Sequence, residues 1–458
     1  MPESEQAVPP AGRIDRRIKL LQELEESQWW PTEKMRVMQA CYAQNLVNHA
    51  LKTVPFYKGR LPVSKGSDVI SLDEWQEIPT MKRSDLVEAG QELVSVAVPP
   101  AHGQVVVKSA SGSTGRPLRI ARTARAEFFW AMSTLRRQAW HGWDPGLSYA
   151  VIRSDKGAKP SNPEGRHISA KFRATWKINP TGPSIFLDVN FPIDHQLAWL
   201  RKHNPAYPQT WPTNAYHLAA HCLAEGIKIP NLSQIHTLGE IVSPEIREIS
   251  RRAFGAKIFD IYAAEEVGDM ALQCPEHDHY HAYAEEVLLE VVDQAGRPSL
   301  PGSVGKVLAT PLHNFASPLI RYEVGDYAEV GEPCPCGRGL PVLHRIIGRE
   351  RNMFRLQSGK SFFPVIPNVV QYLVDTIDVR KYQLAQITME TLEFRMVSPR
   401  RLTAEEEKSA QDMIIQNLGQ TFRVTFSYLD EIPRSPGGKY LDLICELPSD
   451  ESVSVQGQ

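Results

Sequence analysis

The chain has 458 residues, enough for two or three domains, and its 42% hydrophobic and 23% charged content is that of a globular protein. The formal net charge of −2, without a basic run, argues against a nucleic-acid or anionic-membrane partner. No apolar stretch approaches the roughly 18 residues that span a bilayer, and the N-terminus lacks the order of a signal peptide, so we expect a cytoplasmic protein.

The N-terminal region is predicted to be helical after a short tail. Residues 1–12 contain three prolines and few apolar groups, and we expect them to be disordered. Apolar residues at helical spacing predict a helix from Asp15 to Trp30, which Pro31 ends. A second helix is expected over residues 33–53.

Residues 13–347 alternate β-rich runs with helical stretches. Helices are expected from Ala124 to Trp140 and at "PEIREISRRAF". Strands are expected at "QVVVKSA", "LRIA", "KIFDIY" and "EEVLLEVVD". This order predicts an α/β fold, with a large N-terminal domain of mixed sheets flanked by helices.

The composition changes near Gly348 to the basic, glycine-containing stretch "GRERNMFRLQSGKSFFP". This change predicts a domain boundary at residues 346–352. Strands are expected at "YQLAQITM", "TLEFRMV" and "RVTFSYL". Thr403 and Glu406 form a capping-box pattern that opens a helix, and Gly419 is placed to close it. Residues 348–447 are therefore expected to form a small α+β domain, followed by a disordered tail over residues 448–458.

The stretch "SASGSTGRP" at residues 109–117 follows a predicted strand and combines glycines with hydroxyl side chains. Glycines let the backbone approach a ligand closely, and exposed N–H groups in such a loop can bind phosphate. Neither the P-loop nor the dinucleotide-binding glycine pattern fits it. Taken alone, the stretch is more often a solvated surface loop.

Further motifs lie before and after this loop, over residues 30–445. In chain order they are "NHALKTVPFY", "IPTMKRSDL", "LGE", "DIYAAEEVGD", "PLIRYEVGD", "CPCGRGLPVLHRIIGR" and "IPRSPGGK". Together they resemble the adenylate-forming enzymes, in particular the phenylacetate-CoA ligase-like branch that includes CapK-type proteins. The resemblance implies an adenylating domain followed by a small mobile lid domain. It also implies ATP and Mg²⁺ as cofactors.

The resemblance assigns roles to individual residues. Glu266 would be catalytic and coordinate Mg²⁺, and Lys439 would stabilise charge on the α-phosphate. Without the motifs, both would be interpreted as ordinary solvated side chains. Nucleotide binding is implied for Ser109, Ser111, Gly112, Ser113, Thr114, Gly115, Gly239, Glu240, Tyr262, Asp326 and Arg349.

The chain departs from the family pattern at two places. Ala263 follows the motif tyrosine where the family has glycine, and Glu265 replaces the usual threonine. At the interdomain hinge, Arg351 and Asn352 stand where the family has two acidic residues. The sequence therefore supports adenylate formation more strongly than the second half-reaction.

The segment "YPQTWPTNAYHLAAHCL" lies where the family builds part of the acyl-substrate wall. Trp211, Tyr216, His217 and Ala263 are the predicted pocket residues. Aromatic residues at helical spacing are usually core residues, which is the alternative interpretation.

The six cysteines are too sparse for a disulfide framework, but Cys334-Pro-Cys336 can place two thiolates on one soft cation. Cys274 and one histidine of the group at residues 277–281 would complete a structural zinc site. The resemblance favours His281 for that position, with His277 as the second choice. Free surface thiols and solvated histidines are the alternative.

The sequence thus predicts a ligase that activates a carboxylic acid, aryl or related, as an acyl-adenylate with release of pyrophosphate. The expected acceptor is coenzyme A, and a carrier protein or an amine is the alternative. A second alternative is a non-catalytic, zinc-stabilised binding protein on a degenerate adenylating scaffold. No nucleic-acid or membrane partner is expected, and a homodimer is left open.

Overall fold

The structure is a computed structural model that describes residues 11–61, 72–110, 118–155, 162–168, 181–364, 366–379, 381–432 and 441–447. The chain divides into two compact units. Unit 1 comprises residues 1–324 and 328–346, and unit 2 comprises residues 325–327 and 347–458. The short segment 325–327 belongs to the second unit, although it lies about 20 residues before the change of composition at Gly348.

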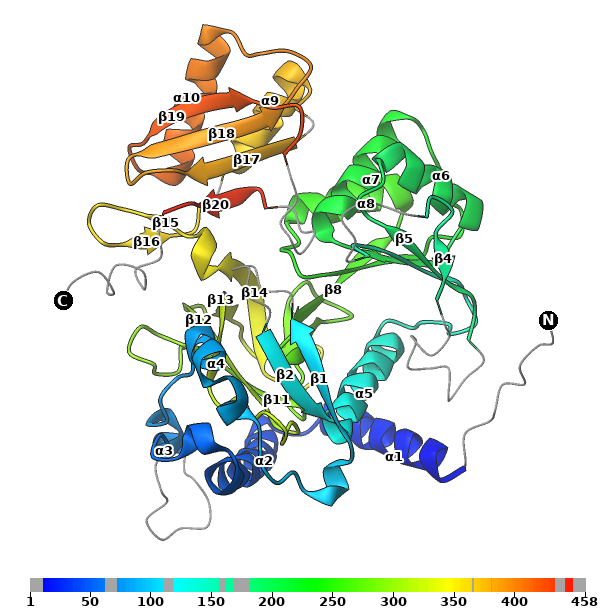
Figure 1. Ribbon diagram of the computed structural model, residues 1–458. Helices are drawn as coiled ribbons and strands as arrows, with labels where there is room; N and C mark the ends of the chain where they lie inside the picture. The colour runs from blue at the N-terminus through cyan, green and yellow to red at the C-terminus, as the bar shows by residue number, and fades with distance from the viewer. Residues whose placement is uncertain are drawn as a thin grey trace. The chain divides into compact units, whose positions relative to one another are not determined.

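Helices dominate the start of unit 1 (Figure 1). Ala11 and Gly12, assigned above to the tail, open the first helix, which ends at Ser27 and not at Trp30, and Pro31 directly precedes the second. The helices are α1 (Ala11–Ser27), α2 (Thr32–Thr53), η1 (Pro55–Tyr57), α3 (Leu72–Gln76), α4 (Arg83–Ala89), η2 (Gly90–Leu93) and η3 (Pro100–His102).

Strands β1 (Val105–Ala110) and β2 (Leu118–Thr123) form an antiparallel pair, with Ser109 opposite Arg119. Helix α5 (Ala124–Trp140) follows at once, with the bounds predicted from the sequence. The Thr123 hydroxyl accepts a hydrogen bond from the Ala126 N–H, which satisfies one of the free donors at the helix start.

One half of the twelve-stranded sheet of unit 1 is largely parallel. Parallel neighbours need crossover connections, and three helices supply them, packing on one another and on this part of the sheet (Figure 1). The strands are β3 (Tyr149–Arg153), β4 (Arg166–His167), β5 (Ser184–Asp188), β6 (Tyr207–Thr210), β7 (Gln234–Leu238) and β8 (Lys257–Ala264). The helices are α6 (Ile193–His203), α7 (Pro212–Ala224) and α8 (Pro244–Phe254).

The other half of this sheet contains antiparallel pairs, beginning at β8 and β9. Its strands are β9 (Gly268–Gln273), β10 (Tyr280–Ala282), β11 (Val287–Val292), β12 (Val304–Pro311), β13 (Tyr322–Val330) and β14 (Val342–Arg349). The change of direction at β8 and β9 falls at Glu265–Val267, so the two halves of the sheet meet beside the motif that contains Glu266.

Two large apolar clusters form the core of unit 1. One includes Leu46, Met270 and Tyr322, and joins the N-terminal helices to the antiparallel half of the sheet. The other includes Trp211 and Ile258, and lies between the crossover helices and the parallel half.

Unit 2 is an α+β body with its own core around Leu373, Phe394 and Ile414. Its sheet has the order β19-β18-β17-β20, with one antiparallel and two parallel pairs. The predicted capping box of Thr403 and Glu406 and the left-handed Gly419 bound α10. The elements are η6 (Glu350–Asn352), β15 (Phe354–Arg355), β16 (Ser361–Phe362), α9 (Pro367–Ile377), β17 (Lys381–Gln386), β18 (Thr391–Val397), α10 (Ala404–Leu418), β19 (Arg423–Tyr428) and β20 (Leu443–Cys445).

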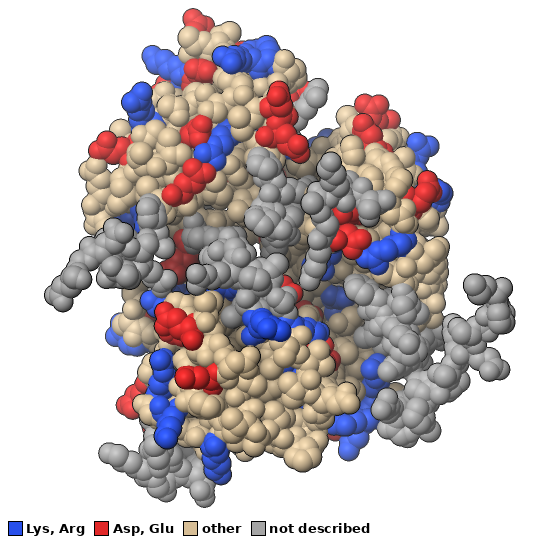
Figure 2. Space-filling view, in the orientation of Figure 1, with Lys and Arg blue, Asp and Glu red and all other residues tan. Residues whose placement is uncertain are grey.

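Basic and acidic side chains are interspersed over the face shown in Figure 2. Among the described residues, no helix is both long enough and apolar enough to cross a membrane.

Candidate functional site

Glu266 lies in the turn between β8 and β9, and its side chain is only 12% exposed. Its Oε1 accepts a hydrogen bond from the Tyr322 hydroxyl at 2.8 Å and lies 3.4 Å from Nη1 of Arg83. Burial, and then the negative charge of Glu266, raise the pKa of Tyr322, so this phenol stays a donor at neutral pH. The carboxylate is thus held in position by a hydroxyl and a guanidinium from two distant parts of the chain.

The two departures from the tyrosine motif fall at the irregular end of β8 and in the turn that follows it. The register with β9 shifts between Tyr262 and Ala263, and the Tyr262 side chain is buried. Glu265 is exposed, and its backbone carbonyl accepts a hydrogen bond from Nη2 of Arg122. Arg122 therefore anchors the turn through the main chain, so this contact does not depend on the side chain at position 265.

Gly239 and Glu240 follow β7. Gly239 has φ = +80°, a conformation that disfavours a side chain and explains the glycine in this motif. Oε2 of Glu240 accepts hydrogen bonds from the Thr213 backbone N–H at 3.1 Å and the Thr213 hydroxyl at 2.7 Å. Glu240 thereby ties the end of β7 to the start of α7.

Asp326 and Arg349, both predicted to bind the nucleotide, lie together in unit 2. The distance between Asp326 Oδ1 and Arg349 Nε is 3.4 Å, and Asp326 is buried. The structure thus brings together two residues 23 positions apart that the motifs predicted separately.

The predicted phosphate loop is only partly described. Ser109 is the fifth residue of β1, whereas Ser111, Gly112, Ser113, Thr114 and Gly115 lie outside the described residues. Lys439 also lies outside them.

The predicted acyl-pocket residues do not share one environment. Trp211 is buried in the core cluster of the parallel half, which is the alternative considered for it above. Tyr216 and His217 are half-buried on α7, with ring centroids 5.6 Å apart, and Tyr216 is hydrogen-bonded to Glu245. Ala263 is half-buried beside the shifted register.

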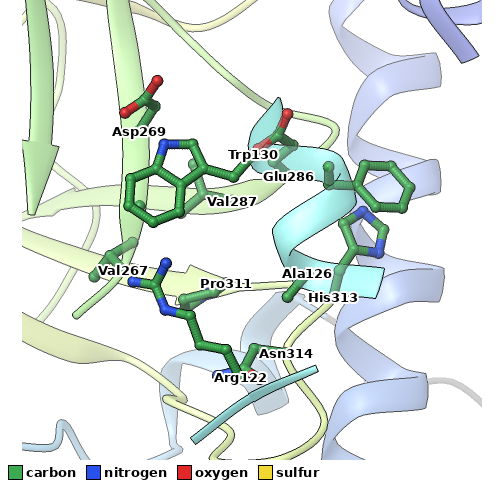
Figure 3. Close-up of a pocket in the computed structure, with 12 residues that line it drawn as sticks. Arg122, Ala126, Trp130, Val267, Asp269, Glu286, Val287, Pro311, His313 and Asn314 are labelled. Carbon is green, nitrogen blue, oxygen red and sulfur yellow. The ribbon is translucent and has the colours of Figure 1, made fainter. Parts of the chain in front are cut away.

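A cavity that the sequence did not reveal lies in unit 1 (Figure 3). It begins at Val267 and Gly268, directly after Glu266. Its polar walls are Arg122, Asp269, Glu286, His313 and Asn314. Because these residues come from separate elements, no local motif marks them, and the adjacent acids Glu285 and Glu286 are the only sequence signal.

Four cysteine and histidine side chains that could hold a metal ion gather at the end of β9, at the start of β10 and in the loop before β14. One ligand atom from each of Cys274, His279, His281 and Cys334 lies within 4.8 Å of all the others. The two sulfur atoms are 3.9 Å apart, close to the about 3.8 Å expected for two thiolates with 2.3 Å bonds to a tetrahedral zinc ion. The donor types and spacing therefore fit zinc.

This group of four contains His279 where the predicted set of Cys274, His281, Cys334 and Cys336 has Cys336. His279 Nε2 lies 2.9 Å from Cys334 Sγ, whereas Cys336 Sγ lies 3.4 Å from His281 Nε2 and outside the group of four. His279 precedes β10 by one residue and is two residues from His281, so an extended backbone turns both rings to the same side. The two-residue spacing of His279 and His281 was the sequence feature that could have identified His279. His277 stacks on His279 instead, with ring centroids 5.2 Å apart.

Comparisons with known proteins agree with the predicted resemblance. Residues 362–446 match the model of the CapK C-terminal domain family. A phenylacetate-coenzyme A ligase from Thermus thermophilus is 27% identical over 447 residues, which covers 89% of this chain and 96% of the relative.

Two solved structures show the fold. A 2-hydroxyisobutyryl-CoA ligase in the postadenylation state, in complex with R3-HIB-AMP, has a TM-score of 0.69 at 20% identity and covers 100% of this chain and 97% of its own. An anthranilate CoA ligase in complex with anthranoyl-AMP has a TM-score of 0.54 at 16% identity, over 73% and 64% of the two chains. The predicted resemblance and fold class are confirmed.

Proposed function

We propose that the protein is an ATP-dependent carboxylic acid–thiol ligase that passes through an acyl-adenylate. A carboxylate oxygen of the acid bonds to the α-phosphorus of ATP, the bond from that phosphorus to the bridging oxygen breaks, and pyrophosphate leaves. The thiolate of coenzyme A then bonds to the acyl carbon, and AMP leaves with the carboxylate oxygen. The relatives of this chain are CoA ligases, which supports the enzyme class.

The observation that carries this proposal is the position of Glu266. A carboxylate held between Arg83 and Tyr322 in a turn at the middle of the sheet is preorganised for a divalent cation. When bound, Mg²⁺ would supply positive charge to the phosphate oxygens, with Glu266 as its protein ligand.

The remaining motif residues would position the nucleotide. Asp326 would accept hydrogen bonds from the ribose hydroxyls, and Arg349 beside it would orient its carboxylate. Backbone N–H groups of residues 111–115 would hold the β- and γ-phosphates, and Lys439 would stabilise the charge on the α-phosphate. Gly239 and Glu240 would lie beside the adenine.

The cysteine–histidine cluster would hold a structural zinc ion. Cys274, His279, His281 and Cys334 would form a closed Cys₂His₂ set, and Cys336, 3.4 Å from His281, could replace one histidine. The loop that carries Cys334 is bonded to the end of α1: the Gly339 N–H donates to the Gln28 carbonyl at 2.9 Å, and Arg338 Nε donates to the Gln28 side chain at 2.9 Å. The metal would therefore stabilise the junction of α1 with the sheet.

The test is release of pyrophosphate from ATP, dependent on Mg²⁺ and on an added acid from an aryl and aliphatic panel, with and without coenzyme A. We expect pyrophosphate with suitable acids and an acyl-CoA product when coenzyme A is present. An acyl-adenylate that reacts with amines or a carrier protein but not with coenzyme A would favour the alternative acceptors. No pyrophosphate with any acid would favour the non-catalytic alternative.

A further inference from the structure

The cavity beside Glu266 has an apolar body with polar groups at two ends. Its apolar walls come from α5 and from the strands opposite, namely Ala126, Phe129, Trp130, Val267, Val287 and Pro311. In Figure 3 the Trp130 indole stands between the guanidinium of Arg122 and the carboxyls of Asp269 and Glu286. The Arg122 guanidinium carbon lies 4.6 Å from the centre of the Trp130 ring, which agrees with this arrangement.

Asp269 is buried and Glu286 is half-buried, and each accepts a side-chain hydrogen bond within the described part of the chain. Glu286 accepts a hydrogen bond from the Ser133 hydroxyl, and Asp269 accepts one from Trp130. Burial, and then the charge of Asp269, raise the pKa of Glu286 well above its usual range. Burial also raises the pKa of Asp269. Two carboxyls in such partly dry surroundings are stabilised when a ligand donates hydrogen bonds to them.

Two basic groups near these carboxyls, Arg136 and Arg122, also have other acidic partners. Arg136 forms a two-pronged ion pair with Glu285, at 2.8 and 3.0 Å, and Arg122 is 3.5 Å from Glu127. Arg137 attracts Asp269 electrostatically. Burial lowers the pKa of His313 to about 4, so this wall residue is neutral at pH 7.

The cavity adjoins the segment where the reaction is proposed to occur. Val267 and Gly268, in its wall, follow Glu266 directly, and Arg122 is hydrogen-bonded to the Glu265 carbonyl. An acid with its carboxylate near Glu266 could therefore direct its other end towards the cavity, whose walls combine apolar side chains with a few polar groups.

We propose that this cavity receives the acyl part of the substrate, and that Asp269 and Glu286 select acids with a hydroxyl or amino group remote from the reacting carboxylate. This inference rests on the proposed ligase function, and it names the substrate class. The indole of Trp130 and the ring of Phe129 would contact the apolar part of the acid, and the two carboxyls would accept hydrogen bonds from its donor.

The experiment compares phenylacetate with its hydroxy and amino derivatives by pyrophosphate release. For the wild-type protein we expect kcat/KM to be at least about tenfold higher for a donor-bearing acid than for phenylacetate. Glu286→Leu removes one acceptor at similar volume and should reduce this preference by about tenfold or more, and Asp269→Asn should reduce it as well. The hydroxy and amino series identify which donor is preferred. Glu248→Gln, on the exposed face of α8, is the matched control and should leave the preference as in wild type.

A wild-type preference below twofold, or an unchanged preference in both cavity variants, would overturn the proposal. Calorimetric titration of the same acids without ATP measures their binding alone. It therefore tests the cavity assignment separately from the ligase function. If no acid releases pyrophosphate but donor-bearing acids bind wild type and not Glu286→Leu, the cavity assignment holds and the ligase proposal fails. If phenylacetate and its derivatives bind equally, or none binds, the cavity assignment is wrong.

Discussion

Replacing Arg136 by methionine should destabilise unit 1 because it leaves a buried carboxylate without its countercharge. Arg136 is 1% exposed and Glu285 is 5% exposed, and the two guanidinium contacts are 2.8 and 3.0 Å long. Removing one partner of such a pair costs about 3–5 kcal/mol. The unfolding entropy of about 2.1 cal/mol/K per residue, applied to a unit of about 340 residues, gives about 0.7 kcal/mol/K. The expected decrease in Tm is therefore about 4–7 °C.

Thermal scans at one heating rate would measure this decrease. Arg251→Met, which breaks the exposed pair with Glu248, is the matched control and should change Tm by about 1 °C or less. The double variant Arg136→Met, Glu285→Leu should recover much of the loss, because no charge is left buried. An Arg136→Met protein as stable as wild type, or a double variant less stable than the single one, would refute the reasoning.

The same pair predicts a pH dependence. Burial alone would raise the pKa of Glu285, but Arg136 beside it holds that pKa below its usual value. A lowered pKa contributes stability that is present above the unfolded value of about 4.3 and is lost as pH falls through the folded pKa. In Arg136→Met, burial without the guanidinium raises the pKa of Glu285, so the difference in Tm from wild type should be largest at neutral pH. It should shrink as falling pH protonates Glu285 in the variant, and shrink further below the unfolded value of about 4.3. A difference that grows on acidification would contradict this sign.

Three further predictions concern the proposed sites. Cys274→Ser, or treatment with a strong chelator, should lower Tm and release about one equivalent of zinc, measured by atomic absorption; a protein with no zinc at full stability would contradict the metal site. Glu266→Gln should reduce pyrophosphate release by about 100-fold with little change in Tm, and wild-type rates would exclude Glu266 from the reaction. Lys439→Ala should likewise depress adenylate formation while far-ultraviolet circular dichroism stays unchanged, and undiminished activity would remove Lys439 from the mechanism.

Local patterns in the sequence predicted much of the architecture. Helix α5 has the predicted bounds, the Thr403–Glu406 capping box forms, and Gly419 ends α10 in a left-handed conformation. These features depend on residues a few positions apart, so sequence spacing is sufficient to specify them. The ordered motifs also identified the resemblance and the position of Glu266.

Contacts between distant segments were decided only by the tertiary structure. The partners of Glu266 come from residues 183 and 56 positions away, and His279 faces Cys334 across 55 residues. Asp269 and Glu286 line one cavity with Arg122 because β2, β9 and the segment before β11 converge there. The sequence by itself thus determined the fold class, the order of the motifs and the candidate residues within each motif. Which side chains share a buried environment, and so which carboxyls are paired and which face a cavity, depends on packing between elements that no local spacing specifies.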